Sequence, residues 1–148
     1  MKLLLAGAAA LTLLIPVCAA AQSGKKTDVY LIKDGVYTCK SCTPVIKVKA
    51  DNIYHPVAGN PNFDSVAVSL TGNGLTETDR KAGKVVRTSA TSVSVDGRNA
   101  TTSFTIYKSG KKASGVIVAR RVAPAPAGAH PPSGSWQTVA SEGAPFSW

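Results

Sequence analysis

The chain has 148 residues, with 17 lysines and arginines against 8 aspartates and glutamates, and 44% of its residues are hydrophobic. This size suits one domain with one modest core, and the apolar content excludes a disordered chain. The net charge of +9 excludes an acidic calcium-loading protein and leaves anionic partners open, while two histidines and three cysteines are too few for a rich transition-metal centre.

Residues 1–21 have the pattern of a secretory signal peptide. Lys2 supplies a short positive region, residues 3–17 are an apolar run, and residues 19–21 are a small-residue cleavage site. The run is shorter than the roughly 20 residues that cross a bilayer. We therefore predict an N-terminal signal helix that is cleaved before Gln22, and a periplasmic or secreted protein with no transmembrane segment after signal removal.

Cys18 offers a second processing route, because a lipoprotein signal places a lipidated cysteine after small residues. Val17 directly before Cys18 fits that route poorly, so ordinary cleavage is favoured. The mature chain then keeps Cys39 and Cys42, an even number in an exported protein, where the compartment is oxidising and a disulfide persists.

Residues 27–122 are rich in valine, isoleucine, threonine and serine, and glycine, asparagine and aspartate punctuate them. No sustained helical spacing of apolar residues occurs there. Alternation is clearest where Val66, Val68 and Leu70 share one face of a strand. The pattern predicts strands, in chain order, at 29–32, 36–39, 45–49, 53–57, 65–70, 75–80, 84–95, 100–107 and 114–122.

Short turns that contain glycine join most of these strands, so neighbouring strands are expected to pair as antiparallel hairpins. The sequence therefore predicts an all-β fold over residues 22–122. We expect an antiparallel up-and-down meander that forms a barrel or a strongly curled partial barrel, because closure removes exposed strand edges. A two-sheet sandwich is the alternative that periodicity does not separate.

Residues 123–148 have a different composition, with five of the nine prolines and no lysine or arginine. Prolines favour extended linkers and donate no ladder hydrogen bonds. We predict a Pro/Ala/Gly-rich linker and an irregular C-terminal tail, largely outside the main core, with residues 135–140 as a candidate last strand.

Two motifs carry a family resemblance. They are DGVYTCKSCTP at residues 34–44, and RVAPAPAGAH at residues 121–130 followed by GSW at 134–136. Over about residues 30–137 the chain resembles a family of uncharacterised exported bacterial proteins with a lipocalin-like β-barrel. The resemblance implies that fold and no activity. Family members continue into a second β-rich part, so the resemblance also implies that this chain is truncated.

Gly134-Ser135-Trp136 is similar to the G-x-W that opens the first strand of lipocalins. There the tryptophan plugs one barrel end, and the glycine lets the backbone approach closely. Three residues are a weak pattern. We favour the simpler interpretation that Trp136 closes over the edge of a core.

Cys39-Lys40-Ser41-Cys42 is a CxxC motif. Redox chemistry needs a lowered thiolate pKa, commonly at a helix N-terminus, and no helical pattern follows this motif. Covalent haem attachment needs a histidine where Thr43 stands, and a zinc site needs a second cysteine pair. A structural disulfide is therefore favoured, followed by free or conditionally paired thiols, a redox centre and a metal site.

No motif for a nucleophile, a phosphate-binding loop or a zinc protease occurs, so we predict no enzyme, no catalytic residue, no metal and no cofactor. His55 and His130 lack a carboxylate at metal-ligand spacing and are expected to be surface or turn histidines. Glu77 and Asp79 are two residues apart, so they share a strand face. We expect that face to be solvated rather than an acid/base pair.

Two basic turns stand out. In an up-and-down meander every second turn lies at the same end, which brings Lys81-Ala82-Gly83-Lys84 beside Lys108-Ser109-Gly110-Lys111. The hypothesis is an anion-binding rim, and the alternative is that the lysines merely solubilise exposed turns. The rim would consist of Arg80, Lys81, Lys84, Lys108, Lys111 and Lys112.

These observations favour an exported non-enzymatic binding protein of the bacterial envelope that holds a small apolar or amphipathic ligand. The alternative is a basic interaction protein that docks an anionic lipid or another polyanion, and a thiol-disulfide redox protein is a distant third. Nucleic acid is disfavoured, because the basic turns lack interleaved aromatic residues beyond Tyr107. A cavity that opens from an apolar interior would favour the ligand carrier, and a filled core would favour surface docking.

Overall fold

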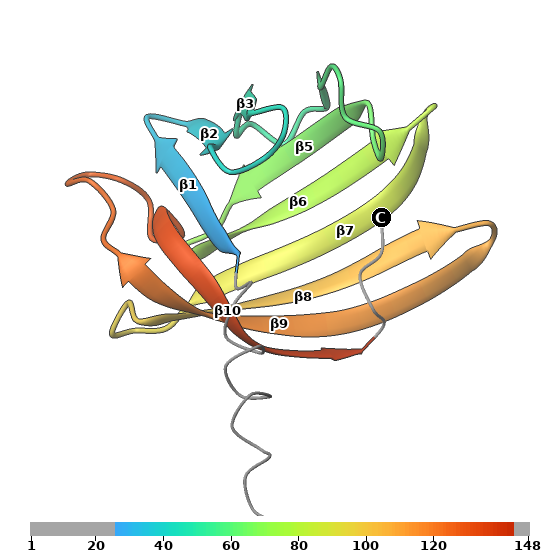
Figure 1. The fold of residues 1–148 in the computed structure, drawn as a ribbon. Helices are drawn as coiled ribbons and strands as arrows, with labels where there is room; N and C mark the ends of the chain where they lie inside the picture. Colours follow the sequence, from blue (N-terminus) through green and yellow to red (C-terminus); the bar gives the residue numbers. More distant parts are fainter. Residues whose placement is uncertain (1–25, 144–148) are drawn as a thin grey trace, which may run out of the picture.

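The computed structural model describes residues 26–143, and the predicted signal helix, Cys18 and the last five residues lie outside this range. Among the described residues there is no helix long and apolar enough to cross a membrane. The fold consists of ten strands (Figure 1), namely β1 (Thr27–Lys33), β2 (Val36–Cys39), β3 (Ile46–Lys49), β4 (His55–Pro56), β5 (Ser65–Leu70), β6 (Gly74–Lys81), β7 (Lys84–Val93), β8 (Asn99–Lys108), β9 (Lys111–Ala123) and β10 (Gly134–Gly143).

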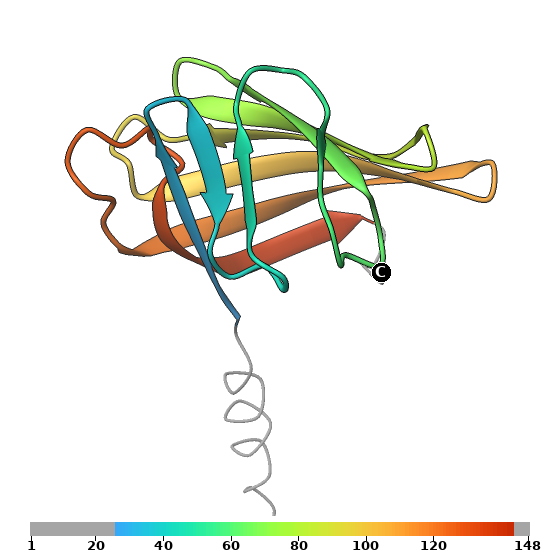
Figure 2. The same ribbon diagram turned by 90° about the horizontal axis from the view of Figure 1, so that it is seen from above.

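The strands form one antiparallel sheet in the order β3-β2-β1-β10-β9-β8-β7-β6-β5-β4. Strands that follow one another in sequence are paired, except for β3 and β4, which are the two edge strands of the sheet. In addition, the last strand, β10, pairs with the first strand, β1. The sheet curls into a nearly closed barrel with β3 near β5 across the seam (Figure 2). The predicted all-β, antiparallel up-and-down meander is confirmed, and the sandwich alternative is wrong.

Three hairpins are closed by the same two-residue turn. Consecutive positive φ angles occur at Asp34-Gly35 (53° and 75°), Ala82-Gly83 (51° and 77°) and Ser109-Gly110 (53° and 77°). Two successive left-handed residues define a type I′ turn, whose twist matches that of the flanking strands. These turns fix the hairpin registers, so the β6–β7 and β8–β9 hairpins end in tips of the same geometry.

The prediction that residues 123–148 form a linker and an irregular tail outside the core is wrong for residues 134–143. These residues form β10, which contains the candidate last strand at residues 135–140 and pairs with β9 on one side and with β1 on the other. Trp136 on this strand is only 4% exposed and packs with Val93 and Ala100. The prolines at 124–132 precede the strand, so they leave its ladder hydrogen bonds intact.

The proline-rich approach to β10 closes one end of the barrel. The backbone amide of His130 donates to the Ile32 carbonyl (2.8 Å), and its ring Nε2 donates to the Gly74 carbonyl (2.7 Å). The buried hydroxyl of Ser133 accepts a hydrogen bond from the Ile32 amide (2.8 Å). His130 is therefore a half-buried residue in the segment of turns before β10, which agrees with the turn position that the sequence offered and corrects the surface position.

The core consists of two clusters of inward-facing side chains. The larger cluster comes from β1, β2, β3, β5 and β6 together with one loop residue, and it contains Ile32, Tyr37, Cys39, Ile46, Val48, Phe63, Val66, Val68 and Leu75. The smaller cluster is built from Val93, Ala100 and Trp136. Bulky side chains from opposite walls therefore fill these parts of the barrel.

Candidate functional site

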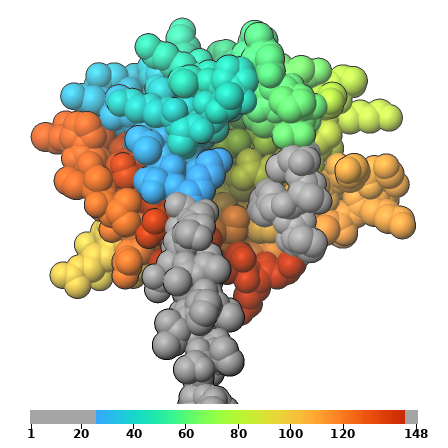
Figure 3. Space-filling view, in the orientation of Figure 1, coloured from blue at the N-terminus to red at the C-terminus, as the bar shows by residue number. Residues whose placement is uncertain are grey.

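The β6–β7 and β8–β9 tips project from the same end of the barrel (Figures 1 and 3), as the alternation of turns predicted. They border one cleft of about 690 Å³, which we call the basic cleft. It is lined by Lys81, Lys84, Val85, Val86, Tyr107, Lys108, Ser109, Gly110, Lys111 and Lys112. Five of the six cations in the hypothesised rim therefore lie on one concave surface.

The lysines of the basic cleft face one another in pairs. Lys81 is directly opposite Lys84, and Lys108 is directly opposite Lys111. Like charges at directly opposed positions destabilise an antiparallel pair. Within residues 26–143 none of the five lysines forms an ion pair with a carboxylate. The cleft thus concentrates positive charge that these residues leave without an ionic partner.

Two neighbouring groups moderate this charge. The Lys81 ammonium donates to the Pro61 carbonyl, and an Asp64 carboxylate oxygen accepts from the Ala82 amide (2.9 Å). Both contacts hold the β6–β7 tip against the loop before β5. Asp64 is not among the residues that line the cleft, so the lining itself carries no acidic side chain.

Arg80 does not belong to the basic cleft, which corrects the hypothesised set of six cations. Its guanidinium carbon lies 3.5 Å from the centre of the Tyr54 ring, a cation–π contact. A register shift between Asp79 and Arg80 interrupts the pairing of β6 with β7. The extra residue of this bulge is Val86 on β7, which has no partner on β6. The contact with Tyr54 places the Arg80 guanidinium outside the lining of the cleft.

The basic cleft also contains exposed apolar surface. Tyr107 is 40% exposed and Val85 is 37% exposed, and each is adjacent in sequence to a lysine of a tip. Lysine stems are themselves apolar up to the ammonium group. The cleft therefore presents hydrocarbon between cations rather than charge alone.

A second depression of about 660 Å³ crosses β6 to β10. Its exposed lining comes from outward-facing small side chains such as Thr76, Ser103 and Ser114, while the alternate residues Ser89 and Phe104 are buried. The buried residues of the two apolar clusters line neither this depression nor the basic cleft, and Val86, which packs against the larger cluster, lines the basic cleft.

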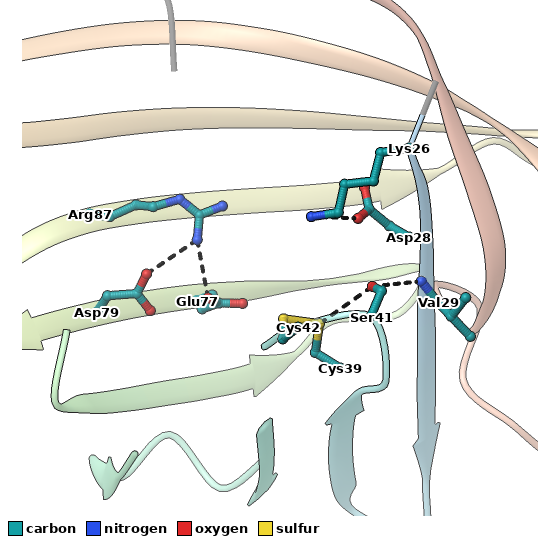
Figure 4. Close-up of a disulfide and its surroundings, with 9 residues drawn as sticks. All are labelled: Lys26, Asp28, Val29, Cys39, Ser41, Cys42, Glu77, Asp79 and Arg87. Carbon is teal, nitrogen blue, oxygen red and sulfur yellow. Dashed lines mark hydrogen bonds and ion pairs between the residues drawn. A yellow bond between two sulfur atoms is a disulfide. The ribbon is translucent and has the colours of Figure 1, made fainter. Parts of the chain in front are cut away.

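Glu77 and Asp79 occupy the inward face of β6, so the expectation of a solvated strand face is wrong. Arg87 Nη1 lies 3.1 Å from Glu77 Oε1 and 3.2 Å from Asp79 Oδ2 (Figure 4). The Asp79 side chain is fully buried, and that of Glu77 is 12% exposed. This cluster lies near the half-buried Tyr30 and the buried Tyr37, inside the barrel wall.

Burial raises the pKa of Asp79 to about 8, with a further rise from the neighbouring Glu77 carboxylate and an opposing effect of Arg87. Burial alone lowers the pKa of Arg87, but the two carboxylates raise it above its ordinary value. Asp79 therefore keeps its proton to a higher pH than an exposed aspartate does. A neutral Asp79 lowers the cost of burying this group of polar side chains.

Cys39 and Cys42 form a disulfide, as the CxxC motif predicted. Cys39 is 1% exposed and belongs to the larger core cluster. The Ser41 hydroxyl inside the motif accepts a hydrogen bond from the Val29 amide (3.0 Å, Figure 4). The disulfide thus closes the bend between β2 and β3, and the Ser41 hydrogen bond holds this bend against β1.

Replacing both Cys39 and Cys42 with alanine is expected to lower the free energy of unfolding by about 2 kcal/mol, because the bridge closes a loop of only four residues. The β circular dichroism should be retained. Urea unfolding of the variant and the parent measures the difference. Two free thiols in the purified parent would contradict the disulfide.

The two histidines lie apart. His55 Nε2 is 2.7 Å from Asp51 Oδ1, and this hydrogen bond lowers the pKa of the exposed Asp51 carboxyl. Asp51 was not predicted as a partner of His55, although the two residues are four apart in sequence. Across residues 26–143 no group of three or more potential ligand side chains could hold a metal ion.

Comparisons of the chain with protein-family models, with curated proteins and with solved structures each found no match. The lipocalin-like resemblance of the two motifs therefore stays a prediction.

Proposed function

We propose that this protein is an exported, non-enzymatic binding protein that docks through its basic cleft onto a phosphate-bearing anionic component of the bacterial envelope. One observation carries the proposal: two turns of near-identical sequence, well separated along the chain, converge on one cleft lined by five lysines and no carboxylate. Clefts lined by one sign of charge focus the field on counter-ions.

Three features support docking at the surface over an enclosed ligand. The apolar clusters are filled by side chains from opposite walls. The depression across β6 to β10 has an outward, hydroxyl-rich lining. The opposed lysine pairs cost stability in the free protein, and a bound anion would relieve that repulsion.

Changing the five lysines of the basic cleft to glutamine is expected to reduce binding to anionic vesicles at least tenfold. Juxtamembrane lysines contribute about 1 kcal/mol each near an anionic surface, and added salt screens this attraction. Sedimentation with phosphatidylglycerol–phosphatidylcholine vesicles at low and moderate salt measures the effect. The changed residues are Lys81, Lys84, Lys108, Lys111 and Lys112.

A charge-matched control separates the cleft from net charge. Five exposed cations outside the cleft are changed to glutamine instead, which are Lys33, Lys40, Lys47, Lys49 and Arg98. We expect this variant to keep most of its vesicle binding. Equal losses in both variants would assign binding to net charge. Parent-like binding by the cleft variant would show that the lysines are solvated surface and overturn the proposal.

A further inference from the structure

We propose that the partner of the basic cleft is the surface of an anionic lipid bilayer, and that Tyr107 and Val85 enter its interfacial region while the lysines hold the phosphates. This inference rests on the proposed function, because it names the source of the phosphate. It goes further in predicting that apolar contact, as well as charge, determines binding.

The two hairpin tips expose apolar side chains beside their lysines. Tyr107 precedes Lys108, Val85 follows Lys84, and both are more than a third exposed at the mouth of the basic cleft. A soluble polyanion is satisfied by charge, and it gains little from an exposed aliphatic side chain. A bilayer offers both headgroup phosphates and acyl chains, and tyrosine is enriched at that boundary, where its ring is apolar and its hydroxyl stays wet.

The two tips are also neighbours at one end of the barrel. The β6–β7 and β8–β9 hairpins are neighbours because β7 pairs with β8, so their midlines lie about 10 Å apart in the sheet. Both tips project beyond the body of the barrel at the same end (Figures 2 and 3). Two neighbouring projections of equal geometry can meet a flat surface together, and lysine stems can lie along apolar surface with their ammonium groups at phosphate level.

The opposite end of the barrel supplies a contrast. Its β7–β8 turn exposes Val95, but the adjacent Asp96 is held by Ser94 and by the Arg98 amide. Hydrogen bonds from these groups lower the pKa of Asp96, so this tip carries a carboxylate at neutral pH. Val95 is therefore an exposed valine outside the basic cleft, and it serves as a control for Val85.

The test is the full chain with Tyr107→Ser and Val85→Ser together, measured against two probes. One probe is vesicles of phosphatidylglycerol and phosphatidylcholine, and the other is soluble inorganic polyphosphate. We expect vesicle binding to fall about tenfold, with the larger loss at moderate salt, and polyphosphate binding to change less than twofold. Val95→Ser, at the other end, should leave both unchanged. Circular dichroism confirms that each variant is folded.

The outcomes separate this inference from the proposed function. Parent-like vesicle binding by the double variant, together with loss of binding in the five-lysine variant, would overturn the bilayer insertion and leave anion docking standing. Equal losses toward vesicles and polyphosphate would also overturn it, since the two side chains would then shape the cleft for any phosphate polymer. If the five-lysine variant still binds both vesicles and polyphosphate as the parent does, both proposals are overturned.

Discussion

Replacing Trp136 with alanine is expected to lower the free energy of unfolding by about 3–5 kcal/mol, the usual cost of removing a large buried aromatic side chain. Trp136 is 4% exposed and packs on Val93 and Ala100 in the smaller core cluster. Its Nε1 donates to the buried Pro132 carbonyl (2.8 Å), and truncation would leave that acceptor without its partner.

The contacts around Trp136 explain why this residue helps to hold β10 in the sheet and the barrel closed. Arg121 lies 4.2 Å from the centre of the indole ring and donates to the carbonyls of Gly97, Pro131 and Ser133. At Gly134 a Cβ atom would lie 2.6 Å from an Arg121 nitrogen, and φ there is +116°. The glycine allows the close approach, and the tryptophan then fills the space beneath it. Loss of the ring therefore loosens the strand that joins β1 to β9.

Urea unfolding followed by circular dichroism measures the effect, and Val139→Ala is the matched control. Val139 is on the same strand but 46% exposed, so its truncation should cost less than about 1 kcal/mol. If Trp136→Ala does not fold at all, Trp136→Phe keeps most of the packing and should cost about 1–3 kcal/mol for the lost hydrogen bond. Stability equal to the parent in both variants would return β10 to the status of an appendage.

The hairpins could be predicted from the sequence because their chemistry is local. Glycine after a polar residue or alanine sets a two-residue turn, and alternating residues on either side set the strands. The β5 strand has the predicted bounds, residues 65–70, and β7 begins at the predicted Lys84. Because every second turn of an up-and-down meander lies at the same end, the β6–β7 and β8–β9 tips could be predicted to share one end of the barrel. Local rules and sheet topology were together sufficient for this part of the site.

A strand at residues 135–140 was a candidate from the sequence, but the full length of β10 and its place between β1 and β9 were not predicted, because the pattern of the strand is broken. A register shift between Thr138 and Ala140 interrupts its pairing with β9, so the period-two alternation fails in the middle of the strand. In sequence, β1 is far from β10, and a proline-rich segment separates β9 from β10. Only the closure of the sheet creates the environment that buries Trp136, and closure is a tertiary property.

The inward orientation of Glu77 and Asp79 escaped prediction for a different reason. The alternate positions on β6 are Thr76 and Thr78, so both faces of the strand are polar. Alternation shows which residues share a face but not which face is buried. The apolar residues Val66 and Val68 on the neighbouring β5, which oppose Asp79 and Glu77, decide the matter, together with the cation that β7 supplies at Arg87.

Replacing Asp79 with asparagine is expected to raise the free energy of unfolding at pH 8 by several kcal/mol, because each unit of difference between the folded and unfolded pKa is worth about 1.4 kcal/mol, and to leave it nearly unchanged at pH 4. The folded-state pKa of Asp79 is about 8, above the ordinary value of about 3.9 in an unfolded chain. A raised carboxyl pKa means that the folded state binds more protons. The parent therefore loses stability as pH rises from about 4 to about 8.

Asparagine removes this loss because it is neutral at every pH. Its amide group can donate to Glu77 and its carbonyl can accept from Arg87, so the contacts of the protonated acid have close substitutes. Urea unfolding of parent and variant at pH 4, 6 and 8 gives the difference, in which titrating groups that do not interact with Asp79 cancel. Asp34→Asn, an exposed carboxylate in the β1–β2 turn, is the control and should show no such trend. A variant less stable than the parent at pH 8 would mean that Arg87 requires the Asp79 carboxylate, and that the triad is held together by charge rather than by a shared proton.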